Sequence, residues 1–217
     1  MEKKKNRFNK AWMQEHVTDH YVHEAKRLGY RARAAFKLIE IDERDKLIRP
    51  GQIIVDLGSA PGSWSQIAAA KLAGNGTVIA LDILPMEPLH GVDFVHGDFT
   101  DDAVVEKLEH LVNGRKVDLV LCDLAPNMSG VPSVDQARIM ELAELALDFS
   151  DKWLKPGGAL LVKVFQGEGF DEFRRKLVSR FGIVGLRKPK ASRDRSRELY
   201  LLAHGPKKPK VGSRSAS

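Results

Sequence analysis

Apolar residues follow two different rhythms along the chain. In seven short stretches they form dense runs rich in Val, Ile and Leu, which predict strands near 52–57, 77–82, 92–95, 117–123, 158–165, 183–187 and 198–203. In five longer stretches they recur every three or four positions, which predicts helices near 31–48, 63–73, 101–113, 133–154 and 170–181. Strands that alternate with helices predict an α/β protein, with a mainly parallel seven-stranded sheet and helices on both faces.

The last two predicted strands break this alternation. The segment between 183–187 and 198–203 is polar and has no helical pattern, so we expect these two strands to pair antiparallel at one end of the sheet. With 217 residues, of which 43% are hydrophobic, the chain is long enough for one core and short for two. We expect one domain over residues 11–204, flanked by basic disordered arms at 1–10 and 205–217.

The charge of the chain favours an anionic partner. There are 35 Lys and Arg against 29 Asp and Glu, a net charge of +6, and the isoelectric point is about 9.4. Part of the surplus crowds residues 3–10 and 207–214. Such runs fit either a nucleic-acid partner or solvated tails, and charge alone does not decide between them.

Other features of the composition exclude several classes of protein. The single cysteine, Cys122, cannot form an intramolecular disulfide or a cysteine-based zinc site. His16, His20 and His23 have the spacing of a helix face, but without a matching carboxylate pattern we expect no metal site. No signal-peptide core and no run approaching the roughly 18 apolar residues of a membrane span are present. We therefore expect a soluble, cytoplasmic protein.

The most informative short segment is 55–65, VDLGSAPGSWS, where a strand passes through small residues into a helix. Gly58 and Gly62 remove side chains where a ligand must approach the backbone, and the following helix offers unpaired amides. Nicotinamide sites use the pattern GxGxxG, which Ala60 and Pro61 interrupt. The loop therefore suits a nucleotide-type ligand without a pyrophosphate.

Two acidic residues follow the next two strands. Asp82 lies 20 residues beyond Gly62, in the position from which a carboxylate accepts hydrogen bonds from ribose hydroxyls. Asp98 follows the third strand and could accept a hydrogen bond from an adenine amino group. Either residue alone reads equally well as a helix cap or a turn aspartate. Together with the glycine loop, they favour a ligand site.

Four further polar residues stand out as candidates for chemistry. Asp123 ends the fourth strand and Lys163 lies among Leu, Val and Phe in the fifth, and the carboxyl ends of neighbouring parallel strands meet in one crevice. Burial disfavours the charged form of a lysine and makes an amine base possible, although a lysine that reaches the sheet edge would look the same. Lys37 interrupts an apolar stretch and Glu198 opens the last strand, yet charges at such places are usually only solvated.

These segments resemble a known family. The matching stretches are 29–38 (GYRARAAFKL), 56–62 (DLGSAPG), 123–130 (DLAPNMSG) and 163–167 (KVFQG). They are similar to the FtsJ/RrmJ (RlmE) ribosomal RNA 2′-O-methyltransferases, and the similarity runs from about Trp12 to Ala203. One position departs from the family pattern, because members often have a second glycine where this chain has Ser63. We expect Ser63 to cap the helix that begins there without loss of cofactor binding.

The resemblance implies a fold, an activity and a set of site residues. It implies a Rossmann-like fold that binds S-adenosyl-L-methionine and methylates a uridine 2′-hydroxyl in the aminoacyl-site loop of 23S ribosomal RNA, within the large ribosomal subunit. It implies a catalytic tetrad of Lys37, Asp123, Lys163 and Glu198, with Lys163 as the proton acceptor. It also implies cofactor contacts from Gly62, Trp64, Asp82, Asp98 and Asp123. We expect a monomer with no obligate protein partner.

A basic segment lies next to Glu198. Residues 187–197 contain six Lys and Arg, which favours contacts to RNA phosphates over a solvated hairpin loop. Arg31 and Arg33 could extend the same surface. Two alternatives stay open: a 2′-O-methyltransferase that acts on tRNA or an mRNA cap, and a catalytically idle ribosome-assembly protein that keeps the fold.

Overall fold

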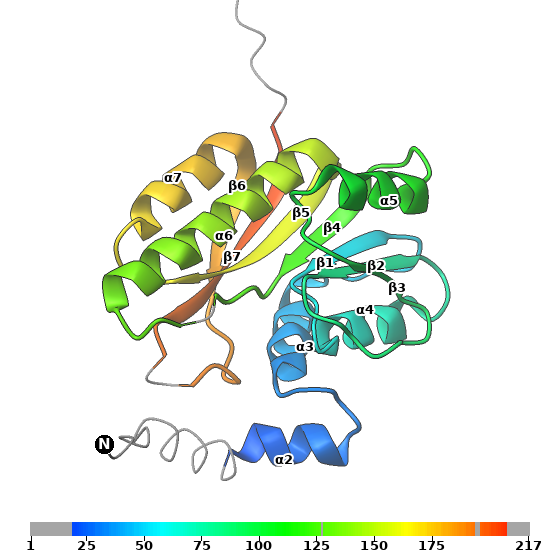
Figure 1. Ribbon diagram of the computed structural model, residues 1–217, viewed down its shortest axis with the longest axis horizontal. Coiled ribbons are helices and arrows are strands. Elements are labelled where there is room, and N and C mark those ends of the chain that lie inside the picture. The colour runs from blue at the N-terminus through cyan, green and yellow to red at the C-terminus, as the bar shows by residue number, and fades with distance from the viewer. Residues whose placement is uncertain (1–18, 127, 194–195, 208–217) are drawn as a thin grey trace, which may run out of the picture.

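Seven strands form a single sheet in the computed structural model, which describes residues 19–126, 128–193 and 196–207 (Figure 1). The strands are β1 (Ile53–Leu57), β2 (Thr77–Asp82), β3 (Asp93–His96), β4 (Val117–Cys122), β5 (Leu154–Phe165), β6 (Phe181–Arg187) and β7 (Glu198–Pro206). Their order is β3-β2-β1-β4-β5-β7-β6. The first five are parallel, and β7 pairs antiparallel with both β5 and β6. The predicted sheet is therefore confirmed.

Helices cover both faces of the sheet, as predicted. Figure 1 shows α3 (Ala34–Asp45) and α4 (Ser63–Leu72) on one face and α5 (Asp102–Val112), α6 (Pro132–Trp153) and α7 (Phe170–Arg180) on the other. An additional helix, α2 (His20–Arg27), precedes them. Among the described residues, no helix has the length and apolar character needed to cross a bilayer.

The structure differs from the predicted elements mainly at their ends. We did not predict α2, because it is only eight residues long and buries only Val22 and Ala25. β5 begins at Leu154, four residues earlier than predicted. We predicted a later start because the sequence of residues 155–158, KPGG, is typical of a turn. β7 continues to Pro206, into the segment we assigned to the C-terminal arm. Residues 1–18 and 208–217, which hold most of the predicted arms, lie outside the described residues.

The alternation of side chains along each strand divides the core into two layers. Val55 and Val162 face α5, α6 and α7, whereas Ile54 and Leu161 face α3 and α4. All four are fully buried. Because both faces are covered, the strands are apolar on both sides, which explains why their sequences are continuous apolar runs.

Candidate active site

Polar side chains replace apolar ones at the carboxyl ends of the parallel strands and at the start of the antiparallel β7, on the face covered by α3 and α4. In β5, the residues that face these helices are Ala159 and Leu161, and Lys163 is the next residue in that series. The same change occurs in the neighbouring strands. The polar residues of this row are Asp56 in β1, Asp123 directly after β4, Lys163 in β5, and Tyr200 and Glu198 in β7. Sheet register therefore brings them together at one edge.

Lys163 is held by Asp123 at the centre of this row. Its Nζ lies 3.1 Å from Asp123 Oδ1 and donates to the Asp123 backbone carbonyl at 2.7 Å. The Lys163 side chain is only 7% exposed. The amine is thus buried and held in place, and not extended into solvent.

The other two members of the predicted tetrad form a second pair. Lys37 Nζ lies 2.7 Å from Glu198 Oε1 and 2.9 Å from Oε2, so α3 and the start of β7 are linked. Ser192 donates its hydroxyl to Glu198 Oε1 at 2.9 Å. The structure therefore brings all four residues together in two ion pairs. One involves Lys163 of β5, and the other joins α3 to the neighbouring strand β7.

Tyr200 lies between the two ion pairs and was missed by the sequence analysis. It is the register partner of Lys163, and its hydroxyl donates to Asp123 Oδ1 at 2.8 Å. Lys37 Nζ lies 5.7 Å from the centre of its ring, a cation–π distance. Burial, with Asp123 nearby, raises the pKa of Tyr200 well above its usual value. The hydroxyl therefore stays protonated and remains a donor to Asp123.

Asp123 is the electrostatic centre of the site. Burial would raise the pKa of Asp123, but Lys163, Lys37 and the Tyr200 hydroxyl together hold this pKa below its usual value. Asp123 therefore carries a negative charge at neutral pH and can orient the Lys163 amine.

A pocket adjoins this site on the side of β1, β2 and β3. Its walls include Gly58, Asp82, Asp98 and Leu124, together with leucines of α6. Leu124 directly follows Asp123, so the pocket and the Lys163 amine are separated by one short segment of backbone. A Cβ on Gly58 would lie 2.1 Å from the Leu124 side chain, and Gly58 has a positive φ of 72°. Only glycine fits there.

The two predicted acidic residues lie at this pocket. Asp82 is buried and accepts backbone amides from Ala60 and Leu84, both at 2.8 Å, so it also fixes the glycine loop. Asp98 is exposed and accepts the amide and hydroxyl of Thr100. Both carboxylates thus serve local turns, as the alternative interpretation held, and both also line the pocket.

Comparisons with known proteins fit this arrangement. Residues 30–206 match the family model described as FtsJ-like methyltransferase. The chain belongs to the FtsJ-like methyltransferase family. It is 62% identical to the ribosomal RNA large subunit methyltransferase E of Azoarcus sp. (strain BH72). The alignment extends over 199 residues and covers 92% of this chain and 97% of the relative. It is 61% identical to the protein of that name from Methylobacillus flagellatus, over 89% of this chain and 94% of the relative.

A solved structure extends the comparison beyond these bacteria. A ribosomal RNA methyltransferase of Plasmodium falciparum superposes with a TM-score of 0.74 and 30% identity, over 82% of this chain and 98% of that chain. The chain thus has the Rossmann-like methyltransferase fold and is an enzyme of the FtsJ-like family.

Two further predicted cofactor residues of this FtsJ-like methyltransferase lie at the start of α4. Gly62 caps the helix with a φ of 99°, so Ser63 is its first residue and not the cap that we expected. The Trp64 side chain is buried away from the pocket, with its ring 5.6 Å from that of Tyr200 and its indole N–H donating to the Ala34 carbonyl. The Trp64 side chain therefore belongs to the core, and the contact of this residue to the cofactor stays a prediction.

Arg31 has a different role in the FtsJ-like structure from the one we predicted. Its guanidinium donates to the backbone carbonyls of Pro61, Glu87 and Pro88 at 2.7 to 2.8 Å. Gln66 completes the arrangement by accepting the Arg31 amide at 3.1 Å. Arg31 therefore joins the glycine loop to the loop after β2, and does not extend a free basic surface.

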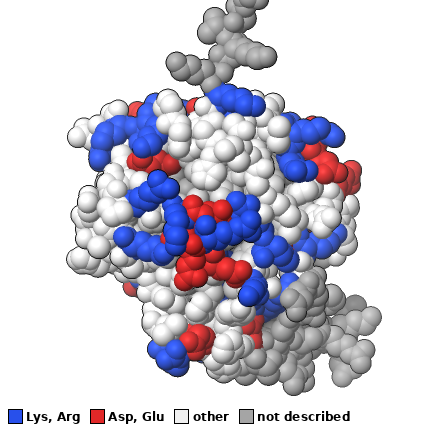
Figure 2. Space-filling model, turned by 180° about the vertical axis from the view of Figure 1, so that it is seen from behind, with Lys and Arg blue, Asp and Glu red and all other residues white. Residues whose placement is uncertain are grey.

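The basic segment before Glu198 is also partly committed to internal contacts. Arg187 forms a two-point ion pair with Asp45 at 2.6 and 2.7 Å, and Lys188 donates to the backbone carbonyl of Glu198 at 2.7 Å. Arg193 lies 3.6 Å from Asp19, the residue that caps α2. Lys190 and Arg197 are exposed, and Arg195 lies outside the described residues. Figure 2 shows the resulting pattern, in which Lys and Arg are interleaved with Asp and Glu.

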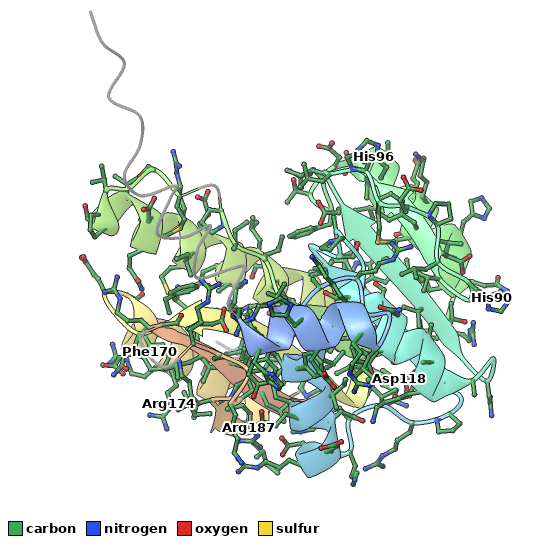
Figure 3. All side chains as sticks on the ribbon, turned by 90° about the horizontal axis from the view of Figure 1, so that it is seen from below. His90, His96, Asp118, Phe170, Arg174 and Arg187 are labelled. Atoms are coloured by element: carbon green, nitrogen blue, oxygen red, sulfur yellow. The ribbon has the colours of Figure 1, made fainter. Side chains whose placement is uncertain are left out.

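The histidines do not form a metal site in the part of the chain that the structure describes, where no group of three or more potential ligands occurs. His20 lies in α2, and His16 lies outside the described residues. In Figure 3 the labelled His90 and His96 lie at the β3 side of the molecule, whereas Arg187 and Arg174 lie at the side of β6 and α7.

Proposed function

We propose that the protein transfers a methyl group from S-adenosyl-L-methionine to the 2′-hydroxyl of a uridine in 23S ribosomal RNA of the large subunit. The observation that carries this proposal is the meeting of the pairs Lys163–Asp123 and Lys37–Glu198 beside a glycine-walled pocket. The names of the most similar relatives support ribosomal RNA of the large subunit as the substrate. The proposal implies a cytoplasmic enzyme that acts as a monomer.

The pocket residues fit S-adenosyl-L-methionine. Asp82 and Asp98 offer carboxylate oxygens to ribose hydroxyls and to the adenine amino group. Ser59, which follows Gly58 in the glycine loop, has a buried hydroxyl without a hydrogen-bond partner among the described residues, a group that a polar ligand at this loop would satisfy. Gly58 has no side chain, and the space that a side chain would take there is filled by Leu124. When bound, the donor supplies a methyl group that its positive sulfur has already activated.

The residues of the chain then need to align the hydroxyl and remove its proton. Lys163, once it has released a proton to solvent and is a neutral amine, accepts the proton of the 2′-hydroxyl at Nζ, and Asp123 orients that nitrogen through its carboxylate and its backbone carbonyl. Lys37 and Glu198 hold the ribose hydroxyl in place from the other side. No further group is required for proton removal.

Replacing Lys163 tests this mechanism. Lys163→Ala should reduce single-turnover methyl transfer by about 10²-fold or more, because the proton acceptor is lost, while the dissociation constant of the donor stays nearly unchanged. The matched control is Lys155→Ala, which removes a half-exposed lysine from the opposite end of the same strand. Transfer rates near wild type in Lys163→Ala would remove Lys163 from the role of proton acceptor.

Mapping the modified nucleotide tests the substrate. Unmodified large subunits incubated with enzyme and labelled donor should gain one 2′-O-methyl group, on a uridine of 23S ribosomal RNA. Label found on tRNA or capped mRNA instead would favour those substrates. No label on any RNA would favour an idle assembly protein.

A further inference from the structure

A second pocket lies on the other side of the candidate active site. It has a volume of about 250 Å³ and lies between the start of α6, the end of β5 and the residues just before β7. Its lining residues are Met128, Pro132, Asp135, Gln136, Ile139, Phe165, Ser196 and Arg197. None of them has a role in the proposed methyl transfer.

The position of this pocket relates it to the substrate ribose. Phe165 lies two residues beyond Lys163 in β5 and is the register partner of Glu198, and Arg197 directly precedes Glu198. The donor pocket is lined by Leu124, and the second pocket by Met128, four residues later in the loop that follows Asp123. A ribose between Lys163 and Glu198 would therefore lie next to both pockets.

The burial of Lys163 requires the target nucleotide to leave its stack. The side chain is 7% exposed, so a ribose flanked by stacked neighbours would not reach the amine without clashes. A nucleotide that swings out exposes its base, and proteins that bind such nucleotides hold the base by stacking and by contacts along its edge. The base needs a partner close to the catalytic row.

The lining of the pocket suits a flat ligand with a polar edge. Met128 at the rim is 62% exposed, so its apolar side chain is open to a ligand, and Pro132 and Phe165 add apolar surface. Asp135 is occupied in fixing the rim, because it accepts the amide and hydroxyl of Ser129 at 2.6 and 2.7 Å. Gln136 donates from its amide nitrogen to two backbone carbonyls, so its position is fixed as well.

We propose that this second pocket binds the base of the target nucleotide, with Met128 as a stacking surface. The inference rests on the proposed function, since it assigns a place to the base whose ribose is methylated. It concerns recognition of the substrate and leaves the donor site unaffected.

Substitution of Met128 tests the proposal. Met128→Ala should lower kcat/KM for unmodified large subunits by about tenfold, because the apolar surface that covers the base is lost, with no change in the donor dissociation constant. Met128→Phe keeps a stacking surface and should stay near wild type. The control is Ile183→Ala, which removes another exposed apolar side chain (69%) in β6, away from the pocket. Thermal melts should be unchanged, since all these side chains are exposed.

A modified substrate separates base contacts from backbone contacts. On subunits reconstituted with an abasic target nucleotide, wild type and Met128→Ala should methylate equally, because the interaction with the base is already absent. An unchanged kcat/KM in Met128→Ala, weaker donor binding, or a defect that persists on the abasic substrate would each overturn the proposal. If wild type itself does not methylate the subunits, the proposed function fails and not merely the pocket assignment.

Discussion

Asp56 shows how a single buried carboxylate couples the fold to pH. The side chain is 1% exposed, its Oδ2 accepts the Ser65 hydroxyl at 2.6 Å, and its Oδ1 has no hydrogen-bond partner among the described residues. Burial raises the pKa of Asp56 to about 7. Asp82 and Asp123, which lie nearby, contribute in the same direction. Asp56 is thus neutral in mildly acidic solution and becomes charged as the pH rises past neutrality.

This titration predicts a pH-dependent stability. Between pH 4 and 7 the folded chain keeps a proton that the unfolded chain has released, so the free energy of unfolding falls as pH rises, by up to about 1.4 kcal/mol per pH unit. Asp56→Asn cannot ionise. Its melting temperature relative to wild type should therefore increase between pH 5 and pH 8, as measured by calorimetry. A difference that does not vary with pH would show that Asp56 ionises normally.

Individual site residues differ in how far the sequence could predict them. Lys163 and Asp123 stand out because a charge within an apolar strand is unusual, and the structure pairs them. Tyr200 gave no such signal, since a tyrosine in an apolar strand reads as ordinary core. Its role depends on the register of β5 with β7, which the sequence alone does not supply. Trp64 was predicted as a site residue from the family resemblance, but its side chain belongs to the core.

At the scale of elements, the cofactor loops depend on a link from the segment before α3. Arg31 holds three backbone carbonyls, of which Pro61 belongs to the glycine loop and Glu87 and Pro88 to the loop after β2. A guanidinium can serve three acceptors at once because its donors have a fixed planar geometry. Arg31 therefore ties together two loops that extend from Gly58 and Ile83, which lie in the wall of the donor pocket.

Arg31→Ala should consequently weaken donor binding. We expect the dissociation constant of S-adenosyl-L-methionine to rise about tenfold or more, since hydrogen bonds from a charged group contribute roughly 1.5–3 kcal/mol. Arg31→Lys should rescue this only in part, because an ammonium lacks the planar geometry. Lys26→Ala, which removes an exposed cation of α2, serves as the control and should leave donor affinity unchanged. Full rescue by lysine would indicate that charge alone matters.

Elements with long or regular patterns were predicted well, and their boundaries less so. α6 and the parallel strands follow from periodicity, whereas α2 has too few buried residues to be recognised. α2 is fixed instead by distant contacts, because its capping residue Asp19 pairs with Arg33 and lies near Arg193 of the β6–β7 loop. In Figure 1 this helix lies below the sheet. In Figure 3, where the molecule is seen from below, it lies in front of the edge of the sheet. Such contacts become visible only once the chain is folded.

For the whole molecule, the net charge of +6 suggests a larger basic surface than the structure offers to RNA. Several Lys and Arg side chains are already paired within the protein, as the ion pair of Arg187 with Asp45 shows. Exposed cations such as Lys190 and Arg197 remain available near the active site. Affinity for RNA should thus depend on a limited set of contacts to phosphates.

Salt titrations check this distinction. The affinity for ribosomal RNA should fall steeply with salt, because phosphate contacts release counterions. Lys190→Ala or Arg197→Ala should each reduce the slope of log K against log salt by about 1. Arg187→Ala should leave the slope nearly unchanged and lower the melting temperature instead, since its charge is already paired. An affinity that is flat across salt concentrations would contradict an electrostatic mode of binding.

The antiparallel placement of β7 also limits how this enzyme can change during evolution. A one-residue slip in the register of β7 would turn Leu199 and Leu201 toward α3, and would send Glu198 and Tyr200 to the opposite side of the sheet. Lys37 would then lose Glu198, and Asp123 would lose the Tyr200 hydroxyl while it kept Lys163. In related sequences, insertions and deletions should therefore occur in the loop before Glu198 and not within β7.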